Sequence, residues 1–371
     1  MAKKRGHGQG SVTRQPNGKW LAQVLIGGRR LSHTAETKRE AERWIRETLL
    51  KAEQGLLPAE AGRVTVGQFL DRWLEAKAPA LRPKTLEYYR DFVRLYLKPV
   101  LGGLRLWDLR PDHLQALYAD MLKRGLNPAT VRLCHATIRT ALNDALRWGL
   151  AARNVAQAVR PPRPERREMK TWTPEEARRF LEAAAGSRFE AAYRLALYCG
   201  LRIGELAGLK WEDIDLEAGR LQVRRTVQRV NGLGLVVGEP KSAAGRRQVV
   251  LPAQVVEALR RRRLAQKEER LLAGPRWEES GHVFTTPTGK PLDPRALERD
   301  LARWVRKAGL PRIRFHDLRH TCATLLLSQG VHPKVVQELL GHSQISITLG
   351  VYSHVLPTLQ EQAAKAMEAL L

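Results

Sequence analysis

Apolar residues recur every three or four positions through most of the chain, which is the spacing of one face of an α-helix. The pattern is most regular in residues 64–159, where it begins after Thr65 and restarts after Pro83, Pro111 and Asn127. Threonine and asparagine cap helices, and proline is favoured in the first turn. Residues 64–159 are therefore predicted to form a unit of four helices.

A different pattern occupies residues 1–60, where short runs of strand-forming residues are separated by turn signals. Asn17-Gly18 is a strong hairpin signal, and Gly27-Gly28 turns the chain a second time. A helical pattern follows. This segment is predicted to be a three-stranded sheet with one helix.

Residues 160–170 are rich in proline and arginine, which predicts an extended linker. Helical periodicity returns in residues 171–371, starting with a capping-box pattern at Thr173. The turn-rich stretch from Leu221 to Leu251 is predicted to be a small β-sheet inserted among these helices. The expected fold class is mainly α with small β-sheets.

Charge narrows the class of partner. The chain has 64 Lys and Arg against 38 Asp and Glu, a formal net charge of +26. Such an excess is best explained by a polyanion, nucleic acid first and an anionic membrane second. No apolar run approaches the roughly 18 residues of a spanning helix, and no apolar segment follows the basic N-terminus as in an export signal. Cys134, Cys199 and Cys322 have no metal-ligand spacing. We expect a cytoplasmic protein that binds nucleic acid and no membrane.

Basic residues lie on the predicted sheet and on the outer faces of the predicted helices. The candidate DNA-binding residues are Arg14, Lys19, Arg29, Arg30, Lys84, Arg132 and Arg139. A small basic sheet can lie in the major groove, and a basic helical unit can clamp a duplex. A solvated charged face explains the residues of the sheet equally well.

Residues suited to phosphate chemistry gather in the last domain. Arg202 and Glu205 are three apart and would share a helix face, a spacing that taken alone indicates an ordinary surface ion pair. Lys241 lies in a turn, where a lysine is normally solvated but can also protonate a leaving oxygen. His316 and Arg319 are again three apart and can point at one spot.

His320 directly follows Arg319, so its side chain would leave the helix in a different direction, and we expect it to be structural. His342 and Tyr352 come next in the chain. The motifs G-L-R-I-G-E-L, P-K-S-x-x-G-R-R, H-D-L-R-H-T, L-G-H and Y-S-H occur in this order between Gly200 and His354. The ordered set resembles the tyrosine recombinase (phage integrase) family. The helical segment is similar to the family's core-site DNA-binding domain, and the N-terminal sheet and helix resemble its arm-site module.

The resemblance implies a catalytic domain of mixed α/β structure and a role for each residue. Tyr352 would be the nucleophile that attacks the DNA backbone and forms a 3′-phosphotyrosine. Lys241 would protonate the departing 5′ oxygen, and His316 would help to remove the tyrosine proton.

The remaining residues would act on the phosphate. Arg202 and Arg319 would clamp its non-bridging oxygens, a task that suits the bidentate guanidinium. His342 would hydrogen-bond the phosphate, and Glu205 would hold Arg202 in place. These cations supply the charge that a metal would otherwise bring, so neither a metal nor another cofactor is expected.

The implied partners are double-stranded DNA attachment sites and three further copies of the chain in a DNA-bound homotetramer. The tail after Pro357 has helical spacing and would dock on a neighbouring protomer, or else pack against its own domain. The arm-type module favours an integrase of a phage or mobile element over an enzyme that resolves chromosome dimers. An additional excisionase or host DNA-bending protein is left open.

Other classes remain alternatives at this point. A DNA-binding regulator on the same fold would lack catalysis, against which the intact set of six residues argues. A type IB topoisomerase would share the nucleophile but would relax supercoils as a monomer and would have no use for an arm-site module. A basic RNA-binding protein would prefer unrelated RNA to the target DNA.

Overall fold

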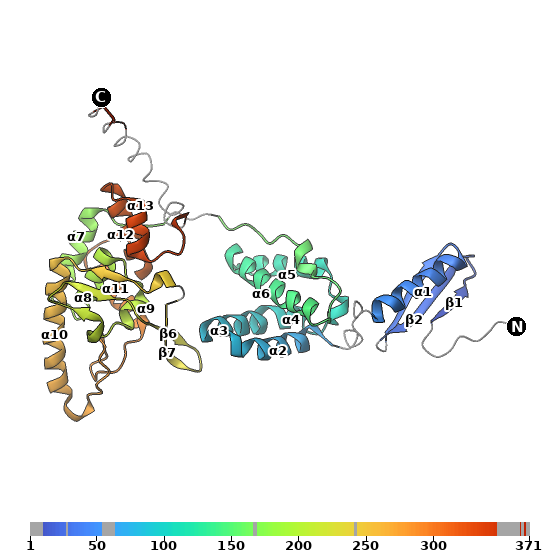
Figure 1. Ribbon diagram of the computed structural model, residues 1–371, viewed down its shortest axis with the longest axis horizontal. Coiled ribbons are helices and arrows are strands. Elements are labelled where there is room, and N and C mark those ends of the chain that lie inside the picture. The colour runs from blue at the N-terminus through green and yellow to red at the C-terminus, as the bar shows by residue number, and fades with distance from the viewer. Residues whose placement is uncertain are drawn as a thin grey trace. The chain divides into compact units, whose positions relative to one another are not determined.

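The structure is a computed structural model that describes residues 10–26, 29–53, 64–165, 169–240 and 243–346, together with 364, 367 and 368. The chain divides into two compact units, Met1–Arg166 and Arg167–Leu371. Figure 1 shows a sheet with one helix and a group of helices in the first unit, and a mainly helical second unit. The predicted fold class, mainly α with small sheets, is confirmed.

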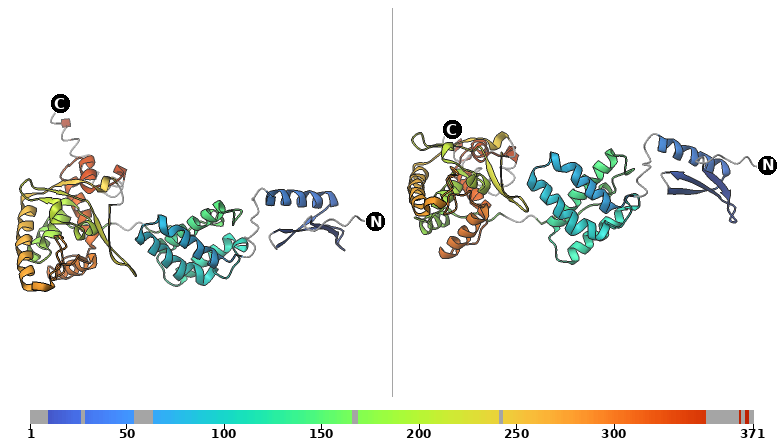
Figure 2. Two further views of the ribbon diagram at one scale, coloured as in Figure 1. Left: turned by 60° about the horizontal axis from the view of Figure 1, so that its bottom comes forward. Right: turned by 90° about the horizontal axis from the view of Figure 1, so that it is seen from below.

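The N-terminal sheet has the predicted three antiparallel strands. They are β1 (Ser11–Arg14), β2 (Trp20–Ile26) and β3 (Arg29–Ala35), in the order β1-β2-β3. Helix α1 (Lys38–Glu53) covers one face (Figure 2). Ala22 and Val24 alternate with exposed or half-exposed neighbours and pack with Ala41 and Ile45 of the helix. Alternation along β2 therefore decides which face of the sheet is covered.

The helical segment of the first unit follows its sequence signals closely. Its helices are α2 (Val66–Lys77), α3 (Pro83–Phe92), α4 (Lys98–Leu101), α5 (Pro111–Lys123) and α6 (Pro128–Arg147). A π-helix at Val93–Leu97 joins α3 to α4 without a break, so the described segment has the four continuous helical stretches that were predicted. Thr65 caps α2 in a capping box with Gln68, and the Asn127 side chain caps α6. In its core the Trp73 indole donates to the buried Asp144 carboxylate at 2.8 Å.

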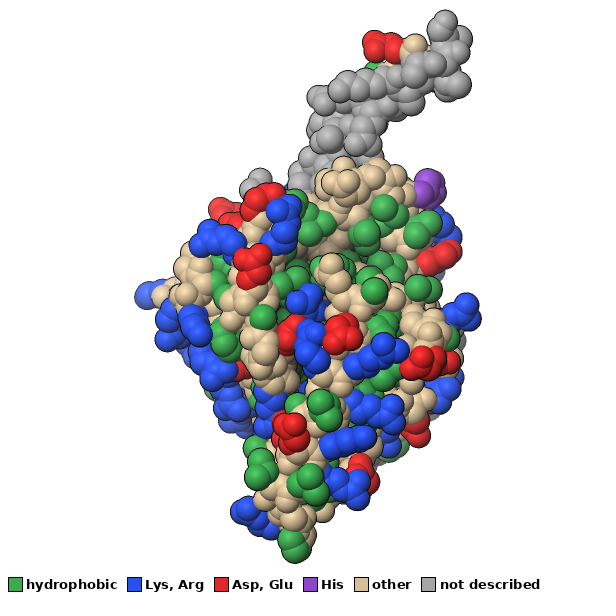
Figure 3. All heavy atoms as spheres, turned by 90° about the vertical axis from the view of Figure 1, so that its left-hand side faces the viewer, with side chains coloured by type: hydrophobic (Ala, Val, Ile, Leu, Met, Phe, Trp, Pro, Cys, Tyr) green, Lys and Arg blue, Asp and Glu red, His purple; other side chains and the backbone are tan. Residues whose placement is uncertain are grey.

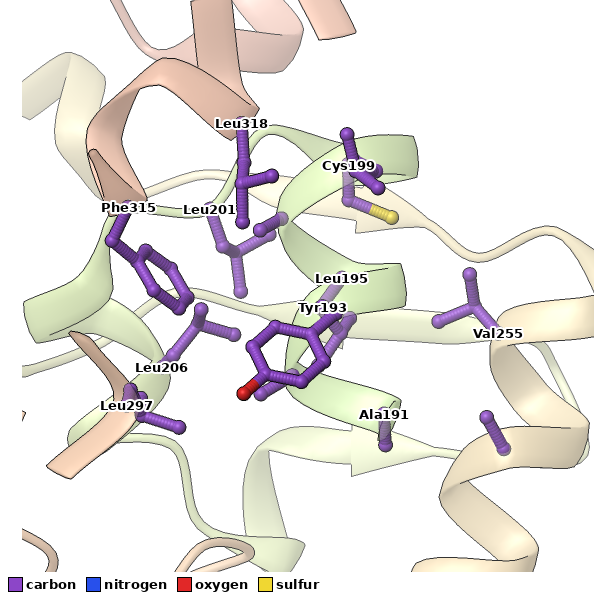
Figure 4. Packing of buried hydrophobic residues seen from close by; sticks show 14 of the residues in the cluster. Ala191, Tyr193, Leu195, Cys199, Leu201, Leu206, Val255, Leu297, Phe315 and Leu318 are labelled. Atoms are coloured by element: carbon purple, nitrogen blue, oxygen red, sulfur yellow. The ribbon is translucent and has the colours of Figure 1, made fainter. Parts of the chain in front are cut away.

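The second unit is built mostly of helices. They are α7 (Pro174–Ala183), α8 (Glu190–Cys199), α9 (Ile203–Ala207), α10 (Ala253–Ala273), α11 (Pro294–Lys307), α12 (Phe315–Ser328) and α13 (Pro333–Leu340). Figure 4 shows the Tyr193 ring of α8 among Leu206 of α9, Leu297 of α11 and Phe315 of α12. This core holds α8, α9 and α12 together, and the site described below lies on their ends.

The strands of the second unit form two sheets instead of the single predicted one. One sheet has the order β4 (Ile214–Asp215), β5 (Arg220–Gln222), β8 (Gln248–Val250), and the other is the hairpin of β6 (Thr226–Val230) and β7 (Gly234–Gly238). The hairpin packs against α9, where a side-chain carbon on Gly204 would lie 3.0 Å from the Val227 carbonyl. The hairpin is thus packed on α9 and is not paired with β5 or β8.

Two sequence expectations concern the whole described chain. Cys134, Cys199 and Cys322 are free and buried, as expected for small apolar residues. Among the described residues, none of the helices combines the length and the apolar character needed to span a bilayer.

Candidate active site

Arg202 is placed by the turn that joins α8 to α9. Helix α8 ends at Gly200, which has a left-handed φ of +63°, and Arg202 is the residue that caps α9. A side-chain carbon on Gly200 would lie 2.3 Å from the Leu340 side chain, so both the backbone conformation and the close approach require glycine. Arg202 therefore emerges at a point where the ends of α8 and α13 meet.

Glu205 is a buried partner of Arg202 and not half of a surface pair. Its side chain is 4% exposed and receives the Arg202 Nη1 at 2.7 Å and the Arg202 backbone N–H at 3.0 Å. The two residues meet because Arg202 precedes the helix and Glu205 is its third residue, the geometry of a capping box. The Arg202 side chain remains 36% exposed, so solvent reaches its guanidinium.

A second arginine, Arg247, binds the same carboxylate. Its Nη2 donates to Glu205 Oε2 at 3.0 Å, and its side chain is 9% exposed. Burial raises the pKa of the Glu205 carboxyl, but the guanidiniums of Arg247 and Arg202 lower it more, so the pKa lies below its ordinary value. Glu205 is thus ionised at neutral pH and orients two cations.

Arg319 projects from the first turns of α12 into the interior. Its side chain is 2% exposed, and its two terminal nitrogens donate to the carbonyls of Gly200 and Leu340. Arg319 therefore ties the end of α8 to the end of α13. Sequence spacing placed this guanidinium in the site but did not predict that backbone carbonyls would hold it.

His316 lies one turn from His320 on α12. Their ring centroids are 4.7 Å apart and the rings are nearly perpendicular, at 89°. His320 was expected to be structural, and it is the ring that packs on His316. Burial, the His320 ring and the positive charges of Arg319 and Arg202 lower the pKa of His316 to about 4. His316 is therefore neutral at pH 7, the form that can accept a proton.

His342 follows directly after α13, which ends at Gly341 with a left-handed φ of +63°. Its backbone N–H donates to the Gln337 carbonyl at 3.1 Å, and the Gln337 amide donates back to the His342 carbonyl at 3.0 Å. Burial, then the charges of Arg319 and Arg202, lower its pKa to about 4. The same two arginines act on both histidines, so the four side chains share one electrostatic environment.

The end of α13 is bound by arginines at three consecutive carbonyls. Arg247 Nε donates to Leu339 at 2.6 Å, Arg319 donates to Leu340, and Arg202 Nη2 donates to Gly341 at 3.3 Å. A helix C-terminus carries partial negative charge, which favours cations at this position. The residue that follows, His342, is thereby fixed against the arginines.

The structure does not test every predicted site residue. Lys241 and Tyr352 lie outside the described residues. Of the candidate DNA-binding residues in the first unit, Arg14, Arg30, Arg132 and Arg139 are exposed. Lys19 and Lys84 are exposed as well.

Each of these two lysines is already engaged in an ion pair. Lys19 pairs with Glu36 at 2.6 Å, and Lys84 pairs with Glu87 at 2.8 Å. The Arg29 side chain lies outside what the structure describes. In the second unit, the face shown in Figure 3 carries Lys and Arg side chains interspersed with Asp and Glu.

Comparison with known proteins identifies the family. The model described as the phage integrase family matches residues 170–358, and the model described as the phage integrase N-terminal SAM-like domain matches residues 65–122. The chain belongs to the phage integrase family. The family predicted from the order of the motifs is confirmed.

Sequence similarity to individual relatives covers nearly the whole integrase chain. A tyrosine recombinase XerC-like protein of Caldanaerobacter subterraneus is 33% identical over 97% of this chain and 94% of its own. The integrase of Mycobacterium phage D29 is 30% identical over 99% of this chain and 98% of its own. The chain is accordingly a site-specific DNA recombinase, and no comparison favours the alternatives of a regulator, a topoisomerase or an RNA-binding protein.

Solved structures agree on the fold. The Tn1549 transposon integrase in complex with a circular intermediate DNA has a TM-score of 0.69 at 22% identity, covering 83% of this chain and all of that chain. A lambda integrase tetramer bound to a Holliday junction has a TM-score of 0.58 at 20% identity, covering 94% of this chain and 96% of that chain. The recombinase fold thus spans both units.

Proposed function

We propose that this integrase cuts and rejoins DNA strands through a 3′-phosphotyrosyl link to Tyr352, and so integrates or excises a phage or mobile element. The observation that carries the proposal is the convergence of Arg202, Arg319, His316 and His342. These residues come from three segments up to 140 residues apart, yet Arg202 and Arg319 both donate to carbonyls at the end of α13 just before His342, and Arg319 lies one turn from His316 on α12. Such a cluster of cations and neutral imidazoles suits a phosphodiester.

The groups have complementary tasks in the proposed reaction. The Tyr352 oxygen attacks phosphorus, and the bond from phosphorus to the 5′ oxygen breaks. Neutral His316 takes the phenolic proton, and Lys241 gives a proton to the 5′ oxygen, so the proton balance closes. Rejoining is the same sequence in reverse, with the phosphotyrosyl bond conserving the energy of the original phosphodiester.

Arginine charge stabilises the transition state in this proposal. Arg202, whose side chain is 36% exposed, would bind a non-bridging oxygen. Arg319 was expected to clamp the phosphate directly, but its terminal nitrogens donate to the carbonyls of Gly200 and Leu340, so we assign it the role of adding positive charge and holding the surrounding backbone. Charge-assisted hydrogen bonds contribute about 1.5–3 kcal/mol each, and more where charge develops in a dry site. His342 would donate a hydrogen bond to the same phosphate. The chain's own cations then suffice, without a metal or a nucleotide.

DNA binding is divided among the domains in this proposal. Residues 1–60 would bind arm-type sites through the sheet, and residues 64–159 would bind the core site. Residues 160–170 would link them to the catalytic domain of residues 171–371. Two DNA-binding modules on one chain raise the effective concentration at the second site. Exposed cations such as Arg14, Arg30, Arg132 and Arg139 would contact phosphates.

Assembly and location follow from the same proposal. The lambda integrase forms a tetramer on a Holliday junction, and we place this chain in a homotetramer on its attachment sites, with the tail after Pro357 docked on a neighbour. DNA as substrate and three unpaired cysteines point to the cytoplasm.

The experiment captures the covalent intermediate on a nicked core-site duplex. Once this duplex is cut, the short strand with the 5′-hydroxyl dissociates, so the strand cannot be rejoined. Core sites are first selected from random duplexes by retention on the Tyr352→Phe protein, which binds but cannot cleave. Wild type is expected to form a protein–DNA adduct in EDTA, and Tyr352→Phe none. A wild type that binds the selected sites and forms no adduct would make the inactive regulator the better account.

A further inference from the structure

Of the two arginines in the G-R-R motif, Arg247 is the one that the structure buries beside the candidate site. Its neighbour Arg246 is exposed and pairs with Glu239 at the surface. The Arg247 side chain is 9% exposed, which leaves it too enclosed to bind a DNA phosphate. A buried guanidinium must have partners for its donors, so its partners indicate what it does.

Among the described residues, the hydrogen-bond acceptors of Arg247 lie in Glu205, at the end of α13 and in its own turn. Nη1 and Nη2 donate to the two Glu205 oxygens at 3.3 and 3.0 Å, and Nε donates to the Leu339 carbonyl at 2.6 Å. Nη1 also lies 3.4 Å from the carbonyl of Gly245 in its own turn. The rigid fork of a guanidinium fixes these acceptors relative to one another.

Through Glu205, Arg247 acts on Arg202. Arg202 and Arg247 contact the same carboxylate from two sides, with Nη1 of Arg202 at 2.7 Å from Oε1. The carboxylate cannot rotate without breaking its bonds to Arg247. The orientation of the solvent-accessible Arg202 guanidinium therefore depends on a residue 45 positions away in the chain.

Through Leu339, Arg247 acts on His342. The Leu339 carbonyl is the first of the three at the end of α13 that accept from arginines, and Gly341 lies against the turn that carries Arg247. A side-chain carbon on Gly341 would lie 2.5 Å from the Ala244 carbonyl and 3.1 Å from Arg247 Cδ. The end of α13, and with it His342, is docked on Arg247.

We propose that Arg247 is a positioning residue for DNA strand cleavage, which fixes Arg202 through Glu205 and His342 through the end of α13. It thereby fixes the relative position of two groups that would act on the scissile phosphate. A misplacement of about 1 Å in such a group can slow a reaction about a hundredfold. This proposal rests on the proposed function, because Arg247 would position residues that act on the same phosphate.

The same unit contains a matched arginine that lacks this connection. Arg262 is 5% exposed, binds both oxygens of Glu269 at 2.7 and 3.0 Å, and donates to the Val283 carbonyl at 3.1 Å. Glu269 is shared with Arg188, as Glu205 is shared with Arg202. None of these residues is a candidate catalytic residue, so Arg262 controls for the loss of a buried arginine as such.

The test compares Arg247→Met with Arg262→Met in the full chain. Binding of the selected core site and the single-turnover rate of adduct formation at saturating protein are measured, together with Tm. Arg247→Met is expected to slow adduct formation by about tenfold or more while the Kd stays within about threefold. Arg262→Met is expected to lower Tm at least as much and to keep the rate within about threefold.

A double-mutant cycle shows whether Arg247 acts through Arg202. In an Arg202→Lys background, Arg247→Met should slow the reaction by a smaller factor than it does in wild type, because the guanidinium that it positions is absent and only its effect on His342 remains. Arg247→Lys, which keeps the charge but not the fork, should fall between wild type and Arg247→Met. If Arg247→Met is unfolded at the assay temperature, Arg247→Lys replaces it in the comparison with Arg262→Met.

The following results would overturn the inference. A rate for Arg247→Met within about twofold of wild type, or equal rate losses in the Arg247 and Arg262 variants, would reduce Arg247 to a structural residue. An undiminished effect in the Arg202→Lys background would exclude action through Arg202. A wild type without any adduct overturns the proposed function, and this inference with it.

Discussion

Glu205→Gln removes one charge from the centre of the site with little change of shape. The carboxylate is 4% exposed and accepts hydrogen bonds from two guanidiniums, at 2.7 Å from Arg202 and 3.0 Å from Arg247. A glutamine keeps one acceptor oxygen but turns an NH2 group toward arginine donors. The buried Arg247 is then left without a counter-ion.

The magnitude follows from that uncompensated charge. Removing one partner of a buried ion pair destabilises a protein by about 3–5 kcal/mol. A domain of this size loses about 2–4 °C in Tm per kcal/mol, so the Tm of the second unit should fall by roughly 6–20 °C. Cleavage should also slow by about tenfold or more, because Arg202 loses the group that orients it.

The assay pairs thermal unfolding with single-turnover adduct formation, and Glu269→Gln is the matched control. Glu269 also joins two arginines, Arg188 and Arg262, but outside the site. It should lower Tm and leave the cleavage rate within about threefold of wild type. The reasoning is refuted if Glu205→Gln leaves Tm within about 2 °C of wild type, or if both variants slow cleavage equally.

Three further predictions concern the frame of the site and the DNA contacts. Gly200→Ala should lower the free energy of unfolding in urea by more than about 2 kcal/mol, because Gly200 has a φ of +63° and a side-chain carbon there would lie 2.3 Å from Leu340. Gly186→Ala, where φ is +70° but the surrounding space is open, should lower it clearly less, and equal losses in the two variants would contradict the packing argument. The pKa of His342 is lowered to about 4, whereas a histidine in the unfolded chain titrates near 6.5. The unfolded chain therefore binds more protons between these two pH values, and the stability of the protein falls as the pH falls from about 6.5 towards 4. His342→Asn should make stability depend less on pH in this range, and an unchanged dependence would contradict the lowered pKa. Arg132→Ala should weaken core-site binding and reduce the slope of log K against log salt by about one; a slope equal to that of wild type would remove this exposed residue from the phosphate contacts.

The helices were predictable because their signals are local. Thr65 and Gln68 form a capping box in the structure, as do Thr173 and Glu176, and Asn127 caps its helix. The apolar spacing that predicted each helix face also matches the buried positions, such as Phe69, Leu70 and Trp73. Caps and periodicity each depend on residues within one or two turns, which a single sequence contains in full.

The sequence could propose the members of the site, but it could not predict the contacts that hold the described ones in place. Arg319 donates to Gly200, 119 residues away, and Arg202 donates to Gly341, 139 residues away. No periodic pattern reports contacts of this separation, so the buried state of Arg319 and the docking of α13 could not be derived. The separation of the hairpin from the other strands, and its packing on α9, likewise left no local signal in the sequence.

Arg247 is a case in which a usable signal was present. Arg247, Val249 and Leu251 alternate with exposed residues and all face inward. An arginine in register with two buried apolar residues of a strand indicates a buried guanidinium that needs an acid, and Glu205 is the acid that it meets. The Lys19–Glu36 ion pair carries no such signal because its partners are 17 residues apart, whereas the i,i+3 spacing of Lys84 and Glu87 was a usable local signal.

The most direct test of the account identifies the residue that carries the DNA. The adduct from the nicked core-site duplex is digested with protease and nuclease, and the nucleotide-bearing peptide is sequenced by mass spectrometry. The account predicts the nucleotide on Tyr352, linked through the 3′ phosphate, with a free 5′-hydroxyl on the released strand. A nucleotide on any other residue, or a free 3′-hydroxyl with a 5′ linkage, would contradict it.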